Sequence, residues 1–358
     1  MFRDLYRLED FDLKYDVKSK LSNLLDEDVY HFIDNNIELN NKTVILDTDS
    51  VFSIDIIRDR VNSILNFKQL NCFGKINKYF EAVNSKLNNG GLLFGCVETY
   101  SQRRERILKN HHPIISYPYY FIDFFLKRVT PKLKITRKIF NFITNNKNRA
   151  ISRVETFGRL YSCGFELVSE KKINNLLFFV VKKVNAPKYD KEPTYGMVIK
   201  LKRIGKNGKE MEVRKLRTMY AFSEYLQGFV YQNNFLEIGG KFRNDYRVTS
   251  WGKFLRTFWI DELPMLWNWL RREVQLVGVR PLSKQYYDMY DDELKQMRIK
   301  YKPGLIPPYY ADMPKLLPEI MESERHYLDA YEKNPIKTQW CYFWKVMYNI
   351  VVKKARSR

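Results

Sequence analysis

The sequence predicts an α/β fold in two successive parts, on three observations. The chain has 358 residues, 45% of them apolar, so it can form two domains with buried cores. Between residues 40 and 185, short apolar runs typical of strands alternate with segments of helical spacing. From residue 197 onwards, one β-hairpin pattern is followed mainly by helical patterns.

The first elements are predicted from apolar spacing. Residues 1–40 mix acidic and basic side chains and predict helix without a motif. The run TVIL, Thr43–Leu46, predicts a short buried strand that is followed by the loop DTDS. Residues 72–88 have helical spacing and stop at Asn-Asn-Gly-Gly, a signal for a helix C-terminus, and LLFGCV predicts the next strand.

The end of the first part predicts a helix and then a hairpin. The helix covers Val154–Tyr161, and the two strands are FELVSE and LLFFVVKKV, separated by a turn at Asn174-Asn175. Residues 182–193 are rich in charge and contain two prolines, which is typical of a linker. We therefore expect a domain boundary near residue 190.

The helix–Gly-Gly–strand unit and the sequence GRLYSCGFELVSE…LLFFVVKK resemble the C-terminal half of a class I methyltransferase-type domain, over roughly residues 70–185. This resemblance implies a Rossmann-like fold. Such domains hold their nucleotide cofactor with a glycine-rich loop after the first strand, but VILDTDSVFSID contains no glycine. Because a backbone without glycine cannot approach a cofactor closely, we expect residues 1–190 to be a degenerate methyltransferase-like domain without cofactor.

Residues 112–145 predict a membrane-contact segment. An aromatic and aliphatic patch, Ile114 to Leu126, precedes a run of basic residues at positions 127, 128, 132, 134, 137 and 138. This combination suits contact with an anionic membrane surface, and the alternative is a helix that packs on its own domain. The segment is too short to cross a bilayer, which requires about 20 apolar residues.

The net charge of +21 predicts a polyanionic partner, which could be nucleic acid, anionic lipid or a nucleotide-linked substrate. The chain has no recognised nucleic-acid motif, so we expect no nucleic-acid partner. The four cysteines have no CxxC or zinc spacing and predict buried free thiols in a reducing compartment. The charged N-terminus is unlike a secretory signal, which favours a cytosolic protein or one bound to the membrane from the cytosolic side.

The most informative stretch, residues 243–282, places adjacent carboxylates, Asp261 and Glu262, before a proline and among arginines. Adjacent carboxylates repel each other unless cations or a metal compensate, so this pair suits a site that handles phosphates and a divalent metal. The alternative is ordinary acidic residues at a helix start. The apolar residues around the pair predict packed helix faces; they are Phe254, Leu255, Phe258, Leu263, Leu266, Trp267 and Leu270.

Five sequence blocks between Gly196 and Tyr310 resemble the bacterial sugar transferase family, the monotopic phosphoglycosyl transferases that act on polyprenol phosphate. The blocks are KLKRIGKNGK, RKLRTM, NDYRVTSWGKFLR, DELPMLWNWL with VQLVGVRPL, and YKPGL. The resemblance implies that residues 191–358 form a helix-rich α+β transferase domain with a small β-hairpin. It also implies transfer of a sugar-1-phosphate from a nucleoside-diphosphate sugar, usually a UDP-sugar, to undecaprenyl phosphate, which initiates cell-surface glycan synthesis.

The resemblance also assigns roles to residues. Asp261 would be the nucleophile that forms a covalent phosphosugar intermediate, and Glu262 would hold Mg²⁺. Arg256 and Arg280 would clamp diphosphate oxygens. Four further cations are left open between phosphate contacts and structural roles; they are Arg203, Lys215, Arg217 and Arg247.

The chain departs from the family pattern in four places. Val279 replaces the proline of VGPRP, the usual glutamine is missing from IKLKR, and LIPPYY replaces the common Thr-Gly pair after Pro303-Gly304. The re-entrant helix expected before residue 196 is replaced by the linker, and residues 114–131 could substitute for it. These departures keep open the alternative of a catalytically inactive, membrane-associated scaffold of a glycan assembly pathway.

We expect the protein at the cytoplasmic face of the bacterial inner membrane, as a monotopic or peripheral protein. The C-terminal segment WCYFWKVMYNIVVKK supports this expectation, because its aromatic residues share one helical face and basic residues follow. Packing of that face on the domain core is the alternative.

Overall fold

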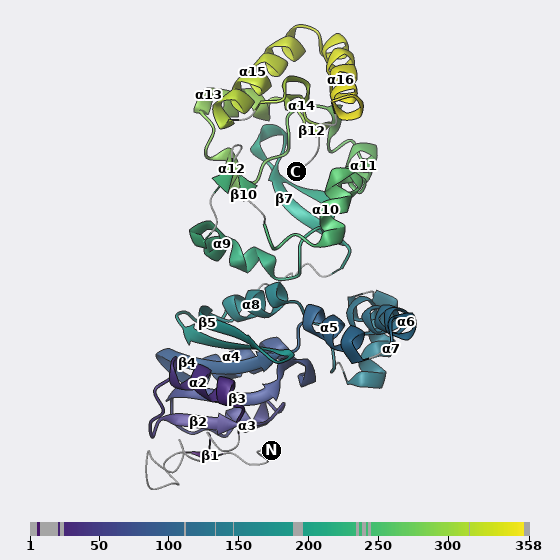
Figure 1. Cartoon of the computed structure of the whole chain (residues 1–358). Coiled ribbons are helices and arrows are strands. Elements are labelled where there is room, and N and C mark those ends of the chain that lie inside the picture. Colours follow the sequence, from purple (N-terminus) through teal and green to yellow (C-terminus); the bar gives the residue numbers. More distant parts are fainter. Residues whose placement is uncertain are drawn as a thin grey trace. The chain divides into compact units, whose positions relative to one another are not determined.

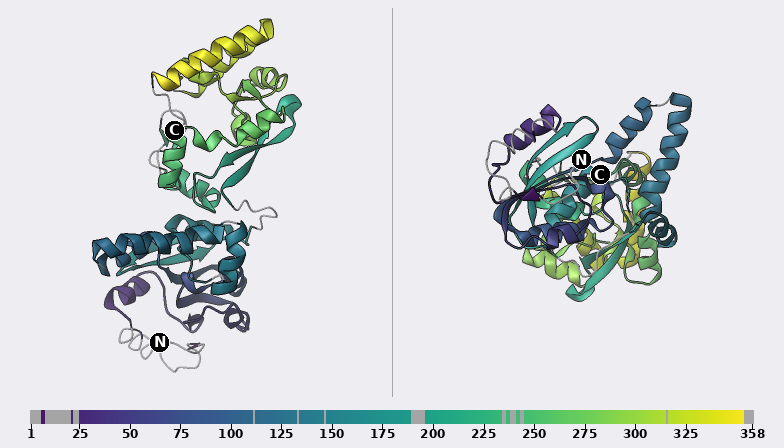
Figure 2. Two further views of the ribbon diagram at one scale, coloured as in Figure 1. Left: turned by 90° about the vertical axis from the view of Figure 1, so that its right-hand side faces the viewer. Right: turned by 90° about the horizontal axis from the view of Figure 1, so that it is seen from below.

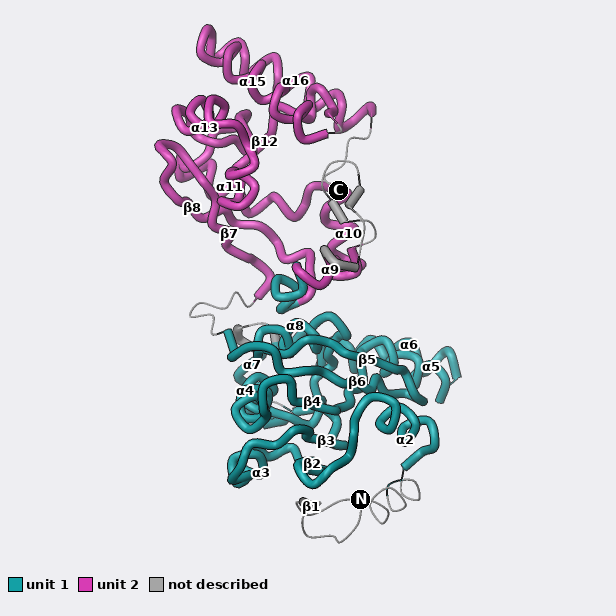
Figure 3. The backbone as a smooth tube through the Cα atoms, turned by 90° about the vertical axis from the view of Figure 1, so that its left-hand side faces the viewer, with its two compact units in different colours: residues 1–193, 221–227 teal, residues 194–220, 228–358 magenta. Residues whose placement is uncertain are grey.

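The computed structural model describes residues 6–7, 21, 25–110, 112–132, 134–145, 147–188, 196–233, 236–237, 241–242, 245–314 and 316–353. Two compact units make up the chain (Figure 3). The first unit contains Met1–Pro193 and Ala221–Gln227, and the second contains Thr194–Tyr220 and Gly228–Arg358. The predicted boundary near residue 190 falls within residues 189–195, which lie outside the described residues, as does most of the helix predicted for residues 1–40.

The first unit is built on a six-stranded mixed sheet in the order β1-β2-β3-β4-β6-β5 (Figure 1). The strands are β1 Tyr6–Arg7, β2 Thr43–Leu46, β3 Val61–Gln69, β4 Leu87–Val97, β5 Phe165–Ile173 and β6 Leu176–Lys183. Strands β2, β3 and β4 are parallel, whereas the hairpin β5–β6 joins the edge of β4 in the antiparallel direction. The predicted mixed α/β fold is therefore confirmed.

The helices of the first unit connect and cover these strands. They are α2 Glu27–Asp34, α3 Phe52–Asp55, η2 Leu70–Cys72, α4 Ile76–Lys86, α5 Tyr100–Asn110, α6 Pro113–Phe124, η3 Phe125–Val129, η4 Thr130–Lys132, α7 Lys134–Thr144, α8 Arg153–Ser162 and η6 Ser223–Leu226. On one side, α2 packs with the sheet in a cluster that includes Phe32, Leu65, Phe94 and Val180. The predicted strand at 43–46, the helix α8 and the hairpin β5–β6 are confirmed.

One predicted helix end is wrong. The helix α4 ends at Lys86, and the Asn-Asn-Gly-Gly sequence lies inside strand β4. The glycines serve the sheet here, because a Cβ on Gly91 would lie 3.0 Å from the carbonyl oxygen of Asn62. Gly90 has a φ of +80°, a conformation that glycine adopts without strain.

The segment Ala221–Gln227, which is distant in sequence, packs on helix α8 within the first unit. The guanidinium of Arg159 lies 4.2 Å from the centroid of the Phe222 ring. Gly158 allows this close approach, because a Cβ there would lie 2.3 Å from the carbonyl oxygen of Phe222. A glycine inside α8 therefore has a packing role that outweighs its low helix propensity.

The second unit contains a β-hairpin, a parallel strand pair and a series of helices (Figure 1). The strands are β7 Val198–Ile204, β8 Glu210–Leu216, β9 Leu236–Glu237, β10 Lys241–Phe242, β11 Gln275–Val277 and β12 Gly304–Ile306. The helices are η5 Lys206–Gly208, α9 Gln227–Asn233, α10 Ser250–Thr257, η7 Ile260–Glu262, α11 Met265–Leu270, α12 Lys284–Tyr287, α13 Asp292–Ile299, α14 Tyr309–Asp312, α15 Leu317–Lys333 and α16 Pro335–Val351. The predicted hairpin is confirmed, with β7 antiparallel to β8.

The predicted packing of the apolar residues on α10 and α11 is wrong. Phe254, Phe258, Leu263, Leu266, Trp267 and Leu270 are all exposed. In α11, the buried side chains are instead those of Met265 and Asn268. Periodicity identified an apolar face correctly, but the helix is held to the unit by a polar residue on its other side.

Asn268 attaches α11 to the hairpin. Its side-chain amide donates to the carbonyl oxygen of Glu212 at 2.7 Å and to the carboxylate of Glu273 at 2.6 Å. Its side-chain oxygen accepts from the backbone N–H of Arg214 at 3.1 Å. The side chain is fully buried, so these three bonds are shielded from water and fix the helix that follows the Asp-Glu pair.

The cysteines and the lengths of the helices can also be compared with the predictions from the sequence. All four cysteines are free, but only Cys96 and Cys163 are buried; Cys72 is half-buried and Cys341 is exposed, so the prediction of buried thiols is wrong for these two. Within the described residues, no helix combines the length and the apolar character that crossing a membrane requires.

The substitution Asn268→Ala is expected to lower the free energy of unfolding of the second unit by about 1–3 kcal/mol, because it leaves buried backbone groups without partners. All six tryptophans lie at or after Trp251, so tryptophan fluorescence during urea unfolding reports on this unit. Gln285→Ala, on the exposed surface of α12, is the matched control. An unchanged unfolding midpoint for Asn268→Ala would contradict the role assigned to this side chain.

Candidate active site

A strained turn directs Asp261 into the second unit. Trp259 has a left-handed backbone, φ +62°, directly before the turn η7 that carries the Asp-Glu pair. Such a conformation costs a non-glycine residue about 1–3 kcal/mol and requires support from its surroundings. The support includes Tyr310, whose ring centroid lies 4.5 Å from that of Trp259. Asp261 is 6% exposed, and its Oδ1 atom is buried without a hydrogen-bond partner among the described residues.

Lys215 compensates the second carboxylate of the pair. It lies on strand β8, and its Nζ atom is 2.6 Å from Oε1 of Glu262. Both side chains are largely shielded from solvent. Lys215 is also an electrostatic neighbour of Asp261, so one lysine serves both carboxylates.

Arg256 reaches the same place from α10. The helix is capped by Thr249, whose side chain accepts from the N–H of Gly252. Gly252 allows α10 to approach the preceding segment, because a Cβ there would lie 1.9 Å from the carbonyl oxygen of Thr218. As a result, Nε of Arg256 donates to Oγ1 of Thr218 at 3.0 Å.

Arg280 follows strand β11, and Arg203 lies on β7. The strand pair β11–β12 is very close, since a Cβ on Gly304 would lie 2.1 Å from the backbone nitrogen of Gly278. The N–H of Gly304 donates to the carbonyl oxygen of Val279 at 2.9 Å, so the residue that replaces proline is tied to β12. Burial and the nearby charge of Arg280 lower the pKa of Arg203, which places these two guanidinium groups in one field.

A buried ion pair holds the backbone of Arg280. Arg298 donates from Nη2 to the carbonyl oxygen of Arg280 at 2.5 Å and from Nη1 to the carboxylate of Glu324. Both members of the pair are buried. The side chain of Arg280 is left to face Tyr309, whose hydroxyl oxygen is 3.5 Å from Nη1.

The two remaining predicted cations have local partners. Arg247 is 3% exposed and binds Asp245 through two bonds, of 2.9 Å from Nε and 2.7 Å from Nη2. Arg217 donates from Nε to the carbonyl oxygen of Gly196 at 3.0 Å. These contacts favour the structural role that the sequence left open for both residues.

The structure thus brings together Asp261, Glu262, Lys215 and Arg256, and it places Arg280 in the same field. Burial raises the pKa of Asp261, and the neighbouring charge of Glu262 raises it further, whereas Lys215 and Arg256 lower it. Burial lowers the pKa of Arg256. Burial thus disfavours the charged forms of both the carboxylate and the arginine. An anionic ligand near the arginines would lower part of this energetic cost.

The carboxylate pair fits a divalent cation that also binds substrate phosphates. Mg²⁺ needs only one or two protein carboxylates when phosphate oxygens and water complete its coordination. The unpartnered Oδ1 of Asp261 and the carboxylate of Glu262 supply oxygen ligands of that kind. The described residues contain no group of three or more His, Cys, Asp or Glu side chains suited to a metal, so a site built by protein ligands alone is not found there.

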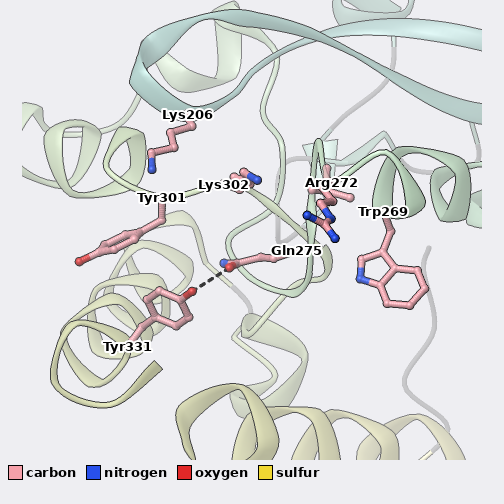
Figure 4. A pocket seen from close by; sticks show the side chains of 8 residues that line it. Lys206, Trp269, Arg272, Gln275, Tyr301, Lys302 and Tyr331 are labelled. Atoms are coloured by element: carbon pink, nitrogen blue, oxygen red, sulfur yellow. Dashed lines mark hydrogen bonds between the residues drawn. The ribbon is translucent and has the colours of Figure 1, made fainter. Parts of the chain in front are cut away.

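A shallow pocket of about 390 Å³ lies elsewhere in the second unit (Figure 4). It is lined by Lys206, Trp269, Arg272, Val274, Gln275, Tyr301, Lys302 and Tyr331. Gln275 lies at the amino end of β11 and accepts from the hydroxyl of Tyr331 at 3.0 Å, whereas Arg280 follows the carboxyl end of that strand. None of the predicted site residues lines this pocket, so the pocket is separate from the carboxylate pair.

Sequence reasoning missed the residues that hold the cations in place. Thr218 binds Arg256, and Arg298 with Glu324 binds the backbone of Arg280. Thr218 could have been predicted from the sequence, since it lies in the RKLRTM block that also contains Lys215. Arg298 and Glu324 belong to no block and are joined only by the fold.

Residues 176–334 match the family model described as bacterial sugar transferase. The resemblance drawn from the five sequence blocks is thereby confirmed. The match begins in strand β6 of the first unit and continues through α15.

Curated relatives agree with this family. The galactosyl transferase CpsE of Streptococcus agalactiae is 35% identical over 104 residues, which cover 29% of this chain and 23% of that protein. The undecaprenyl-phosphate galactose phosphotransferase of Salmonella typhimurium is 32% identical over 108 residues, covering 29% and 22%. The exopolysaccharide production protein ExoY of Rhizobium meliloti is 36% identical over 109 residues, covering 29% and 48%. The matched region thus spans less than half the length of each relative.

Solved structures similar to this chain include an O-methyltransferase family protein from Burkholderia thailandensis. Its TM-score is 0.23 at 12% identity, and the match covers 48% of this chain and 41% of that one. This likeness is too distant to assign a function to the first unit.

The substitution Asp261→Asn is expected to raise the melting temperature of the second unit at neutral pH. Because the folded-state pKa of Asp261 is raised, the folded state binds the proton more tightly than the unfolded state does. The carboxylate therefore lowers stability progressively as the pH rises from its unfolded-state pKa through its raised folded-state pKa, and this loss disappears at lower pH. The difference between Asp261→Asn and the unsubstituted protein should shrink as the pH falls, because protonation of Asp261 leaves both proteins with a neutral side chain. A lower melting temperature for Asp261→Asn at pH 7 would contradict this assignment.

Proposed function

We propose that the protein transfers a sugar-1-phosphate from a nucleoside-diphosphate sugar, expected to be a UDP-sugar, to undecaprenyl phosphate. The product would be an undecaprenyl-diphosphate sugar, the first lipid-linked unit of a cell-surface glycan. The observation that carries this proposal is the buried, partly unpartnered Asp261 carboxylate, which shares its site with Glu262, Lys215 and Arg256. The family of residues 176–334 and the name of the Salmonella typhimurium relative point to the same reaction class.

The reaction proceeds in two displacements at one phosphorus atom. A carboxylate oxygen of Asp261 attacks the phosphorus that bears the sugar, and the bond from this phosphorus to the bridging oxygen breaks. The nucleoside monophosphate leaves with that oxygen, and an aspartyl-phosphosugar remains. A phosphate oxygen of undecaprenyl phosphate then attacks the same phosphorus, and the bond to Asp261 breaks, which regenerates the carboxylate.

The cations make attack by an anion on an anion possible. Arg256 and Arg280 present planar groups of N–H donors that match phosphate oxygens in a bidentate manner. Partial burial of Arg256 limits competing water, which strengthens its interaction with developing charge. Lys215 favours the ionised form of Asp261, since its charge lowers the pKa that burial raises.

Glu262 would hold Mg²⁺, with the unpartnered Oδ1 of Asp261 as its neighbour. When bound, Mg²⁺ would supply positive charge that offsets part of the negative charge of the donor phosphates. Glu262 now binds Lys215 at 2.6 Å, so the lysine and the cation would share this carboxylate.

The acceptor is a lipid, so the reaction would take place at a membrane, which we propose is the cytoplasmic face of the bacterial inner membrane. Helices around the site support this location. Exposed apolar residues lie on α10 and α11, which flank the Asp-Glu pair, and on α16, and they include Trp251, Phe258, Leu270, Trp340 and Trp344. Tryptophan and aliphatic side chains on a helix surface suit the lipid–water boundary.

Incubation with Mg²⁺ and a panel of UDP-sugars, without acceptor, is expected to increase the intact mass of the protein by one sugar phosphate. The adduct should be absent in Asp261→Asn, whose turnover should fall on the order of 10⁴-fold because the nucleophile is lost. Mass spectrometry of the intact protein measures the adduct and identifies the sugar. A folded protein that forms no adduct with any donor would favour the catalytically inactive scaffold, and turnover retained by Asp261→Asn would exclude it as nucleophile.

Arg256→Lys is expected to reduce kcat/KM on the order of 10²-fold, since a lysine cannot supply the bidentate contact. Arg217→Lys is the matched control, because Arg217 contacts the backbone of Gly196 and its replacement should change kcat/KM by less than about ten-fold. Steady-state kinetics with a membrane-dispersed acceptor measures both values. Equal losses in the two variants would remove the special role of Arg256.

A further inference from the structure

The first unit carries a second apolar surface, and the helix pair that forms it is here called the α6–α7 hairpin, residues 113–144. Helix α6 is apolar on nearly all sides, and Ile114, Ile115, Tyr117, Tyr119, Phe121 and Ile122 are exposed. Figure 1 shows α5, α6 and α7 beside the sheet of this unit, and the left view of Figure 2 looks onto them from that side. A helix that is apolar all round and still exposed requires a partner that covers it.

Helix α7 adds a narrower apolar face to this surface. Ile139, Phe142 and Ile143 are exposed at helical spacing, and Phe142 is 88% exposed. Phe140 points inward instead and is buried, with Nζ of Lys127 5.9 Å from its ring centroid. The exposed apolar residues of α7 therefore do not belong to the core of the unit, because Phe140 already occupies the core-facing side of this helix.

Buried ion pairs hold α6 and the turn η3 in place. Asp123 of α6 accepts two bonds from Arg103 of α5, at 2.7 and 2.8 Å, and all of these groups are buried. Arg128 of η3 binds Glu155 of α8 at 3.0 Å. These buried ion pairs thus fix the segment that presents the apolar side chains on the surface of the unit.

The charges of the α6–α7 hairpin indicate which kind of partner covers its apolar surface. In the sequence of residues 113–144, Asp123 is the only carboxylate, and it is consumed by Arg103 inside the unit. Arg137 and Lys138 are exposed beside the apolar face of α7. A second copy bound about a two-fold axis would set this basic face against itself, which is unfavourable. An anionic lipid surface instead matches both the apolar side chains and the positive rim.

We propose that the α6–α7 hairpin is a membrane-docking element that inserts its exposed apolar side chains shallowly into an anionic lipid surface. The insertion is shallow because the 12 residues of α6 span only about 18 Å, whereas a bilayer core is about 30 Å thick. The aromatic side chains enter the boundary between headgroups and acyl chains, and Arg137 and Lys138 bind lipid phosphates. This proposal does not depend on the transfer reaction proposed for the second unit.

The test places a reporter on the hairpin itself, so that lipid contact by the second unit does not confound it. In the full-length chain, Cys72→Ser and Cys341→Ser remove the two accessible thiols, and Phe142→Cys is labelled with a polarity-sensitive fluorophore. Vesicles of phosphatidylethanolamine with phosphatidylglycerol should shift its emission to the blue, and lipids carrying a nitroxide quencher should quench it. Phe52→Cys, at a similarly exposed phenylalanine on α3 of the same unit, is the control and should show neither change.

A second measurement tests affinity. Ile114→Gln combined with Phe121→Gln should weaken vesicle binding on the order of ten-fold, whereas Phe52→Gln with Ile56→Gln, another exposed pair, should not. A label at position 142 that stays in water while the protein binds vesicles would overturn the proposal. A blue shift that follows protein concentration without vesicles would overturn it in favour of a second copy. Failure of the transfer reaction is read separately, as a missing phosphosugar adduct in the absence of vesicles.

Discussion

The burial of Asp261 beside Glu262 is the constraint on which the second unit depends. Neighbouring like charges repel each other, and burial in a region of low dielectric constant adds to this cost. Lys215 and Arg256 offset the repulsion, and each has to be held where it acts. Gly252 permits the approach that lets Thr218 hold Arg256, and the paired glycines 278 and 304 set the course of the chain before Arg280. Positions without a side chain thus determine where the charges lie.

The ion pair between Arg298 and Glu324 extends this dependence one layer further. Both residues are buried, and burial raises the pKa of Glu324 while Arg298 lowers it. Removing one partner of such a pair leaves an uncompensated buried charge, which costs about 3–5 kcal/mol. Arg298 also holds the carbonyl oxygen of Arg280, so a residue distant from the phosphate-binding groups fixes the backbone of one of them. The strain at Trp259 belongs to the same arrangement, since it turns Asp261 inward at the cost of an unusual backbone conformation.

Local sequence patterns predicted the elements whose signals are local. The structure agrees with the predicted strand at 43–46, with helix α8 and with the β-hairpins β5–β6 and β7–β8. It also agrees with the predicted grouping of Asp261, Glu262 and Arg256. Periodicity could not decide which side of α11 is buried, because the anchoring residue is Asn268 and its partners lie more than 50 residues away on the hairpin. Nor could it separate Arg247 from Arg256. Both arginines lie in one sequence block. Only the fold shows that Asp245 binds Arg247 and that Asp261 is an electrostatic neighbour of Arg256.

The exposed apolar faces of the two units have one physical explanation if the proposed reaction takes place. A donor that is soluble and an acceptor that is a lipid must both reach the same phosphorus atom, and a covalent intermediate lets them do so in turn. One set of cations, Arg256, Arg280 and Lys215, then serves both half-reactions, because the leaving nucleoside monophosphate vacates the positions that the lipid phosphate needs. If the surface around the site faces lipid, as proposed, the leucine, phenylalanine and tryptophan side chains that α10 and α11 expose beside the Asp-Glu pair would contact that lipid. Exposure of these side chains to water is unfavourable, and contact with the proposed membrane surface would remove that cost.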